Sequence, residues 1–139
     1  MFLLDTNVLS ELMAAQPSPE AAAWVSAQPL DQLFTAAVCQ AEVFAGLAVL
    51  PEGRRRSALT RAAQAMFRGD FAERILPFDA GTAETYADLF AVRRRSGRST
   101  ATIDLMISAI ARVHQATVVT RNVADFDGCE VPIINPWAA

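Results

Sequence analysis

The first twelve residues constrain the fold of this chain more than any other segment. Met1 to Leu4 form an unbroken apolar run that leads directly into Asp5, and from Val8 onward the apolar pattern becomes helix-like. A strand buried on both faces has a short continuous apolar run, so residues 1–4 are predicted to form a central parallel strand. Asp5 would then lie at the carboxyl end of that strand, where open α/β sheets place their ligand crevices.

The rest of the chain alternates short strand-like runs with longer helical patterns. Further strands are predicted near residues 33–35, 74–78, 117–120 and 131–134, and helices over residues 8–13, 19–27, 38–50, 54–67, 80–95 and about 99–115. This alternation indicates the α/β class, with a mostly parallel sheet of about five strands and helices on both faces. No repeat or linker interrupts the order, so residues 1–139 are predicted to form a single domain.

Charge and cysteine usage narrow the possible partners and the compartment. The net charge is −3 and all 12 basic residues are arginines, which cluster at residues 54–56 and 93–95 with Arg98 close behind. The weakly acidic overall field would attract a polyanion poorly, so nucleic acid would be bound through local patches. Cys39 and Cys129 are typical of reduced core thiols, and no signal peptide or membrane-length apolar stretch is recognisable, which predicts a cytoplasmic protein without a membrane partner.

Three acids occupy positions that packing alone does not explain. Asp5 follows the first predicted strand, Glu42 has neighbours that are nearly all apolar or small, and Asp104 lies in the most apolar helix of the chain. Carboxylates are seldom buried without a partner. Each acid also has a structural explanation, since Asp5 could cap the next helix, Asp104 could complement the helix dipole and Glu42 could be half exposed. Together, however, they predict a cleft of carboxylates.

Carboxylates gathered in one cleft repel one another and have raised pKa values unless a cation neutralises them. An all-oxygen site without histidine or cysteine favours Mg²⁺ or Mn²⁺. One or two such ions can activate a water and stabilise the charge that builds on a phosphodiester. Thr6, Asn7 and Ser108 could hold that water or orient a carboxylate, and Ser108 follows Asp104 by four residues, which places both on one helix face.

Several segments occur together in the order of a known family. They are LLDTNVLSEL at Leu3–Leu12, AEVFAGL at Ala41–Leu47, TIDLMISAIA at Thr102–Ala111, VTRNVADF at Val119–Phe126 and the closing INPW at Ile134–Trp137. With these segments the chain resembles the PIN-domain ribonucleases, and among them the VapC toxins of VapBC-type toxin–antitoxin pairs, close to the FitB-like branch. The resemblance covers the whole chain.

The resemblance implies a PIN-like three-layer α/β/α fold and a toxin that is a metal-dependent endoribonuclease. It implies that Asp5, Glu42 and Asp104 bind Mg²⁺ or Mn²⁺ and that Asn122 stands near the place of the family's fourth acid. Asn122 offers a neutral oxygen without adding charge, which weakens a second metal site, and Asp125 could substitute if its loop bends inward. The catalytic set implied is therefore Asp5, Glu42, Asp104 and Asn122.

The resemblance also implies partners and leaves the role of the arginines open. The partners implied are an RNA substrate, a VapB- or FitA-like antitoxin, a second copy of the chain, and operator DNA bound through the antitoxin. Arg95, Arg98 and Arg121 are the candidate RNA contacts, because a guanidinium donates two hydrogen bonds to a phosphate at once. A solvated helix end is the alternative for the arginines at 93–95 and Arg98, since basic residues complement the dipole there.

Rival functions differ in how well the residues exclude them. A haloacid dehalogenase needs a second Asp where this chain has Asn7, and a receiver-type module needs a lysine, which the chain lacks. A catalytically inactive PIN-like module, acting through complexes with an antitoxin and nucleic acid, is the remaining alternative. Asn122 keeps this alternative open, whereas the joint presence of Asp5, Glu42 and Asp104 argues against it.

Overall fold

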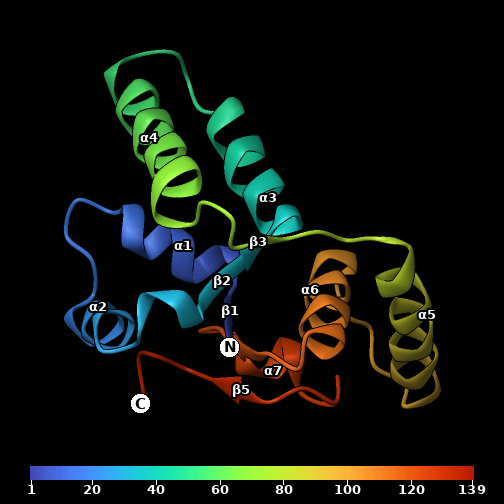
Figure 1. Cartoon of the computed structure of the whole chain (residues 1–139). Coiled ribbons are helices and arrows are strands. Elements are labelled where there is room, and N and C mark those ends of the chain that lie inside the picture. The colour runs from blue at the N-terminus through green and yellow to red at the C-terminus, as the bar shows by residue number, and fades with distance from the viewer.

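A sheet of five strands forms the middle layer of the structure, which is a computed structural model describing residues 1–139 (Figure 1). In sheet order the strands are β3 (Ile75–Leu76), β2 (Leu33–Ala36), β1 (Phe2–Leu4), β4 (Thr117–Val119) and β5 (Ile133–Ile134). Every neighbouring pair is parallel, and Leu3 is in register with Phe34 on one side and Val118 on the other. The predicted parallel α/β sheet is confirmed, with β1 as its central strand.

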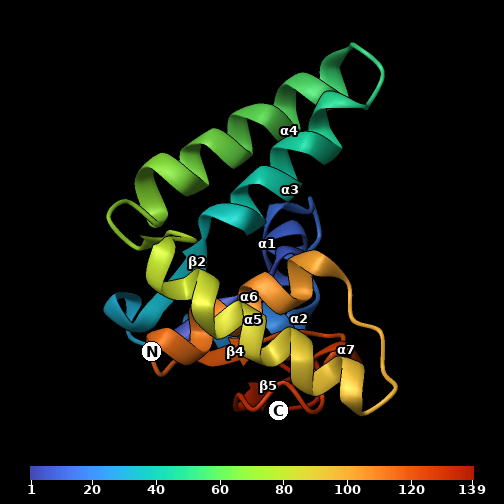
Figure 2. The ribbon, with the colours of Figure 1, turned by 90° about the vertical axis from the view of Figure 1, so that its right-hand side faces the viewer.

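Helices cover both faces of this sheet. They are α1 (Thr6–Met13), α2 (Pro19–Ser26), α3 (Ala37–Ala48), α4 (Arg54–Ala65), α5 (Ala80–Arg95), α6 (Thr102–Val113) and α7 (Val123–Phe126). In Figure 1, α1 and α2 lie on one side of the strands and α5 and α6 on the other. Figure 2 shows α3 and α4 as an antiparallel pair that projects beyond the sheet. None of the helices combines the length and apolarity needed to cross a membrane.

Several element boundaries differ from the sequence prediction. The edge strands β3 and β5 span only two residues each, and Pro77, which cannot donate to a ladder, follows β3 directly. Helix α6 begins at Thr102 rather than near residue 99, after the extended backbone of Ala101. Short helical turns at Leu30–Gln32 and Met66–Asp70, and the helix α7, were not predicted.

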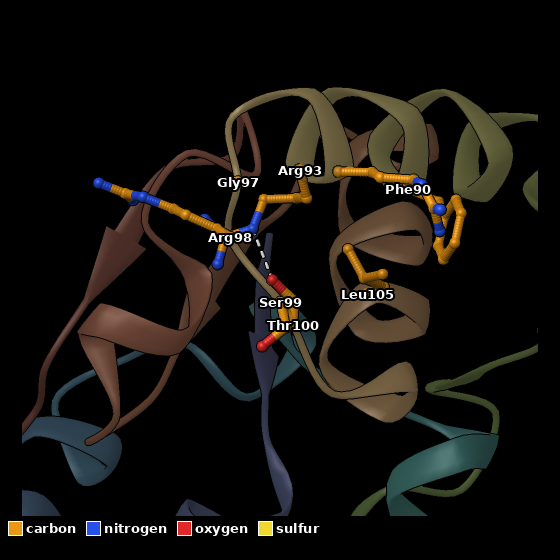
Figure 3. A pocket seen from close by; sticks show the side chains of 8 residues that line it. Phe90, Arg93, Gly97, Arg98, Ser99, Thr100 and Leu105 are labelled. Carbon is orange, nitrogen blue, oxygen red and sulfur yellow. Dashed lines mark hydrogen bonds between the residues drawn. The ribbon is translucent and has the colours of Figure 1, made fainter.

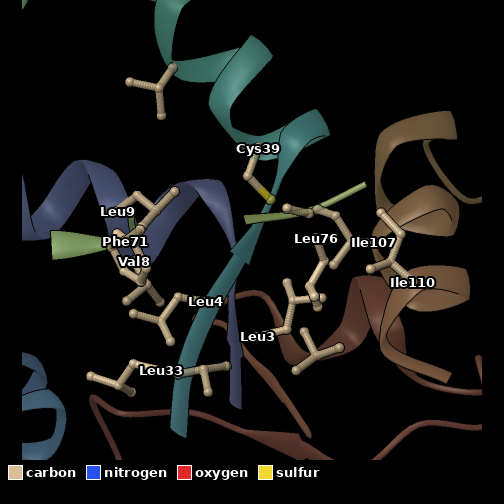
Figure 4. Close-up of a cluster of buried hydrophobic side chains, with 14 of the residues drawn as sticks. Leu3, Leu4, Val8, Leu9, Leu33, Cys39, Phe71, Leu76, Ile107 and Ile110 are labelled. Atoms are coloured by element: carbon tan, nitrogen blue, oxygen red, sulfur yellow. The ribbon is translucent and has the colours of Figure 1, made fainter. Parts of the chain in front are cut away.

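The core surrounds β1 on both faces, as the apolar run at the start of the chain predicted. Figure 4 shows Leu4 on the side of α1 and Leu3 on the side of Ile107 of α6. All three side chains are almost completely buried, because successive residues of a strand point to opposite faces and both faces are covered. Cys39 and Cys129 are buried free thiols, in agreement with the prediction.

The strand order reverses at one point along the edge of the sheet, between the carboxyl ends of β1 and β4, and we call this point the crevice. From β1 the chain proceeds to β2 and β3 on one side, and then to β4 and β5 on the other. The order reverses between β1 and β4, and ligand crevices of open α/β sheets lie outside the carboxyl ends of strands at such a point. The backbone N–H of Asp5 donates to the Val119 carbonyl at 3.1 Å, so the residues that follow β1 and β4 meet there.

Candidate functional site

Asp5 lies in this crevice and is the one acid among the buried residues. Its Oδ1 accepts a hydrogen bond from the Val8 N–H at 3.1 Å and its Oδ2 accepts one from the Thr120 hydroxyl at 2.5 Å. Burial raises the pKa of Asp5, the hydrogen bonds oppose this rise, and the charge of Glu42 adds to it. Asp5 therefore caps α1, as considered from the sequence, and at the same time lies within the electrostatic influence of Glu42.

Asp104 lies in the first turn of α6 and is half buried. Its pKa is raised to about 6, first by burial and then by the negative charges of Asp125, Asp5 and Glu42. Charges influence one another in this way only at short range, because solvent and salt screen more distant ones. The fold therefore brings these four acids, which are far apart in the sequence, into one negatively charged neighbourhood.

Glu42 lies on α3 with an exposed side chain, so the expectation that it would be hard to place on a solvated face is wrong. Helix α3 buries Cys39, Val43 and Leu47 at helical spacing, and Glu42 lies beside that stripe, on the side that opens to a cavity between α1, α3 and α4. The Thr6 hydroxyl donates to Glu42 Oε1 at 2.5 Å. Thr6, a predicted supporting residue, thus holds one of the acids.

The other predicted supporting residues occupy different surroundings. Ser108 is buried, and its hydroxyl donates to the backbone carbonyl of Asp104 at 2.8 Å, so it bonds the main chain and not the carboxylate. Asn7, Asn122 and Asp125 are exposed. The backbone N–H of Asn122 donates to the Thr120 hydroxyl at 3.0 Å, which ties the loop after β4 to the same hydroxyl that holds Asp5.

Thr120 is the residue of this site that sequence patterns did not single out. It is completely buried, and its hydroxyl is the shared partner of Asp5 and the Asn122 backbone. The signal in the sequence is a hydroxyl residue directly after the strand Thr117–Val119. That signal becomes specific only when β4 is known to lie beside β1.

The donor chemistry of the site fits a hard divalent cation, although the side chains do not form a closed cage. No three histidine, cysteine, aspartate or glutamate side chains converge closely enough to hold one ion. The acids at the crevice offer oxygen alone, and mutual repulsion contributes to the raised pKa values of Asp5 and Asp104. A divalent cation would relieve that repulsion, and oxygen atoms are the ligands that such hard cations prefer.

The three arginines predicted to contact RNA lie in separate surroundings. Arg98 forms an ion pair with Asp127 at 3.1 Å. The guanidinium of Arg121 lies over the Trp137 ring, 5.1 Å from its centroid. Arg95 lines a different hollow, between α5 and α6, that neither of the other two borders. The fold thus does not gather them into one patch.

Comparison with known proteins gives consistent matches along the whole chain. The sequence model of the PIN domain matches residues 2–127. A VapC ribonuclease of Sinorhizobium fredii is 39% identical over 137 residues, which are 99% of this chain and 98% of that protein. Toxin FitB of Neisseria gonorrhoeae is 36% identical over 137 residues, 99% of each chain. In a structure of FitAB bound to a DNA fragment, the matching chain has a TM-score of 0.92 and 36% identity, over 99% of this chain and 96% of that one.

Proposed function

Because this chain belongs to the PIN domain family, we propose that it is the toxin of a type II toxin–antitoxin system and a metal-dependent endoribonuclease that hydrolyses RNA phosphodiester bonds. The observation that carries the proposal is the crevice between β1 and β4, where burial raises the pKa of Asp5 and of Asp104, the charge of Glu42 adds to both rises, and the charge of Asp5 adds to that of Asp104. Two relatives above 30% identity are named ribonuclease and toxin, which favours this function over an inactive interaction module.

The proposed site consists of Asp5, Glu42 and Asp104 as ligands of Mg²⁺ or Mn²⁺, with Asn122 as a neutral oxygen donor at the rim. When bound, such an ion supplies Lewis-acid activation and neutralises charge during phosphodiester hydrolysis. The chain itself holds the carboxylates in position. Thr120 and the start of α1 orient Asp5, and the first turn of α6 holds Asp104 close enough for the charge of Asp5 to raise its pKa.

The supporting residues act through the ligands in this proposal. Thr6 orients Glu42 through its hydroxyl, and Ser108 stabilises the turn of α6 that carries Asp104. Asn7 and Asp125 are exposed and would interact with water or with a second ion. Arg95, Arg98 and Arg121 remain predicted RNA contacts, to be tested one by one because they lie apart.

The partners proposed for this chain follow its relatives. A chain of FitAB has the same fold as this chain, and that structure shows FitAB bound to a DNA fragment. We therefore propose a FitA- or VapB-like antitoxin, a homodimer of this chain, and binding of operator DNA through the antitoxin. The proposed site of action is the cytoplasm, where RNA is found. A single domain over residues 1–139 is supported by β5, which lies beyond the PIN match and still pairs with β4.

Cleavage of total cellular RNA by the purified, antitoxin-free chain tests the proposal. We expect discrete fragments with Mg²⁺ or Mn²⁺, and background levels with EDTA or in Asp5→Asn and Asp104→Asn variants. Asp88→Asn, the same chemical change at an exposed position of α5, is the matched control and should cleave normally. Cleavage that survives both site variants would contradict the site. No cleavage by folded protein with metal present would favour the inactive module.

A further inference from the structure

A cavity of about 430 Å³ opens where α5 ends and α6 begins (Figure 3). Its eight lining residues include Arg93, Arg94 and Arg98, and no acid. Its volume lies in the range of roughly 300–1,000 Å³ that ligand sites occupy. Leu105 lines the cavity and directly follows Asp104, and consecutive Cα atoms are about 3.8 Å apart. The same turn of α6 therefore borders the cavity and carries Asp104, a residue of the proposed catalytic site.

Arg93 is a buried cation without a carboxylate partner. Its side chain is 5% exposed, its Nε donates to the Thr100 hydroxyl at 2.5 Å, and its Nη1 donates to the Asp127 carbonyl. Figure 3 shows the bond to Thr100. Both acceptors are neutral, and the ion pairs of the structure involve Arg98 and Arg112 instead. Because buried charges are costly unless compensated, this position favours an anion in the adjoining cavity.

Two further arginines of the cavity, Arg94 and Arg98, are accessible to an anion. Arg94 is exposed, and Arg98 pairs with Asp127 while the two side chains stay 52% and 68% exposed. Surface ion pairs of this kind contribute little, so a phosphate can compete for Arg98. A guanidinium suits phosphate because its planar fork donates two hydrogen bonds. The cavity thus combines one buried and two accessible guanidinium groups.

Phe90 gives the cavity an aromatic wall. Its side chain is 45% exposed although it is large and apolar. Exposed aromatic side chains beside basic groups provide stacking platforms for the bases of single strands. Such a wall favours a ligand that carries an aromatic base over a simple inorganic anion.

We propose that this cavity binds a backbone phosphate of single-stranded RNA, with a neighbouring base against Phe90, and thereby positions the strand relative to Asp104. The inference rests on the proposed function and assigns part of its substrate-binding surface. RNA is the occupant that the observations favour, because the cavity shares a turn of α6 with Asp104 and carries both guanidinium groups and an aromatic ring. With a net charge of −3, the chain needs such a local site to hold a polyanion.

RNA binding without cleavage tests the inference. The full chain is titrated in EDTA against a fluorescein-labelled single-stranded RNA of about 12 nucleotides, a length within the span of single-strand sites. Arg94→Gln and Arg98→Gln should each raise Kd about tenfold, the effect of one charge-assisted contact. In the double variant, the plot of the logarithm of the association constant against log salt should also become less steep, by about 0.7 for the one phosphate lost. Phe90→Ala should raise Kd about tenfold and leave the salt slope unchanged.

Arg61→Gln is the matched control, because it removes the same charge from an exposed position on α4. Equal affinities for Arg61→Gln and for the double variant, or no binding by the unmodified chain, would overturn the inference. A double variant that binds a polyglutamate peptide more weakly than the unmodified chain does, but binds RNA equally well, would identify an acidic-peptide site and also overturn the inference. These outcomes are independent of the proposed function, since cleavage is measured separately with metal present.

Discussion

At the residue scale, Asp5 and Thr120 show how one hydrogen-bonded pair serves the fold and the proposed site together. Asp5 uses one oxygen to cap α1 and receives the Thr120 hydroxyl on the other. Thr120 also accepts the Asn122 backbone N–H. One buried hydroxyl thus fixes both the orientation of Asp5 and the start of the loop that contains Asn122. Thr120 is a positioning residue in the proposed mechanism.

Replacing Thr120 tests this role. Thr120→Val removes the hydroxyl and leaves Asp5 Oδ2 without its donor, so we expect metal-dependent RNA cleavage to fall by roughly 10- to 100-fold, the effect of losing a partner that orients a metal ligand. Thr120→Ser keeps the hydroxyl and should recover most of the activity. Initial cleavage rates are measured with metal present, and melting temperatures in EDTA show whether each variant is as stable as the unmodified chain. Equal rates for the Val and Ser variants at unchanged stability would contradict a positioning role.

Asp104 should make the stability of the metal-free protein depend on pH. Its pKa is about 6 in the fold against 3.8 for an unperturbed aspartate, so the folded state holds this proton more tightly. Below about pH 3 the group is protonated in both states and costs no stability, whereas the cost grows as pH rises toward about 6 and persists above it. Because Asp104 is only half buried, screening leaves a cost on the order of 1 kcal/mol.

Asp104→Asn should remove that cost. In urea denaturation with EDTA, we expect the variant to be more stable than the unmodified chain at about pH 8 and equal to it at about pH 3. Added Mg²⁺ should stabilise the unmodified chain more than the variant, because a ligand stabilises the state that binds it. A gain of the same size at both pH values would show that charge repulsion is not its cause.

At the scale of elements, the place of a strand in the sheet decides how much it contributes to stability. Strand β1 pairs on both sides and its residue Leu4 is completely buried, whereas the edge strand β5 keeps Ile133 only partly buried. Helices α1 and α6 close over the two faces of β1, so truncation there leaves a cavity that neighbouring elements cannot fill.

Truncation of the two strands tests this difference. Leu4→Ala should lower the free energy of unfolding by about 3–5 kcal/mol, the range for buried leucines, and Ile133→Ala by about 1–2 kcal/mol because less of its area is removed from water. Urea denaturation in EDTA measures both. Similar losses for the two variants would indicate that the edge strand is packed as tightly as the centre.

At the scale of the whole molecule, strand order and charge distribution place opposite fields side by side. The acids collect at the carboxyl ends of β1 and β4, while Arg93, Arg94 and Arg98 surround the cavity at the end of α5. A cation would reduce the repulsion between the first field and RNA, and the second field attracts phosphate with or without it. The overall charge of −3 conceals this arrangement, which limits unspecific attraction to other polyanions.

Local features of this fold were predictable from the sequence because they depend on neighbouring residues. The apolar run before Asp5 predicted a buried central strand, and Asp79 and Gly97 marked the ends of α5 through a side-chain cap and a positive φ of 74°. The acids at Asp5 and Asp104 stood out because their surroundings in the sequence are apolar. In each case a few adjacent residues contain the physical cause.

Other features depended on the tertiary structure, because they arise between elements distant in the chain. Thr120 and Asp5 are 115 residues apart and meet only because β4 pairs with β1. The rotation of α3 about its axis decided that Glu42 is exposed. The course of the loop after α5 decided that Arg98 forms an ion pair with Asp127 and does not join Arg95 in one patch. Periodicity can state which residues share an element, but strand order and packing decide which side chains share a site.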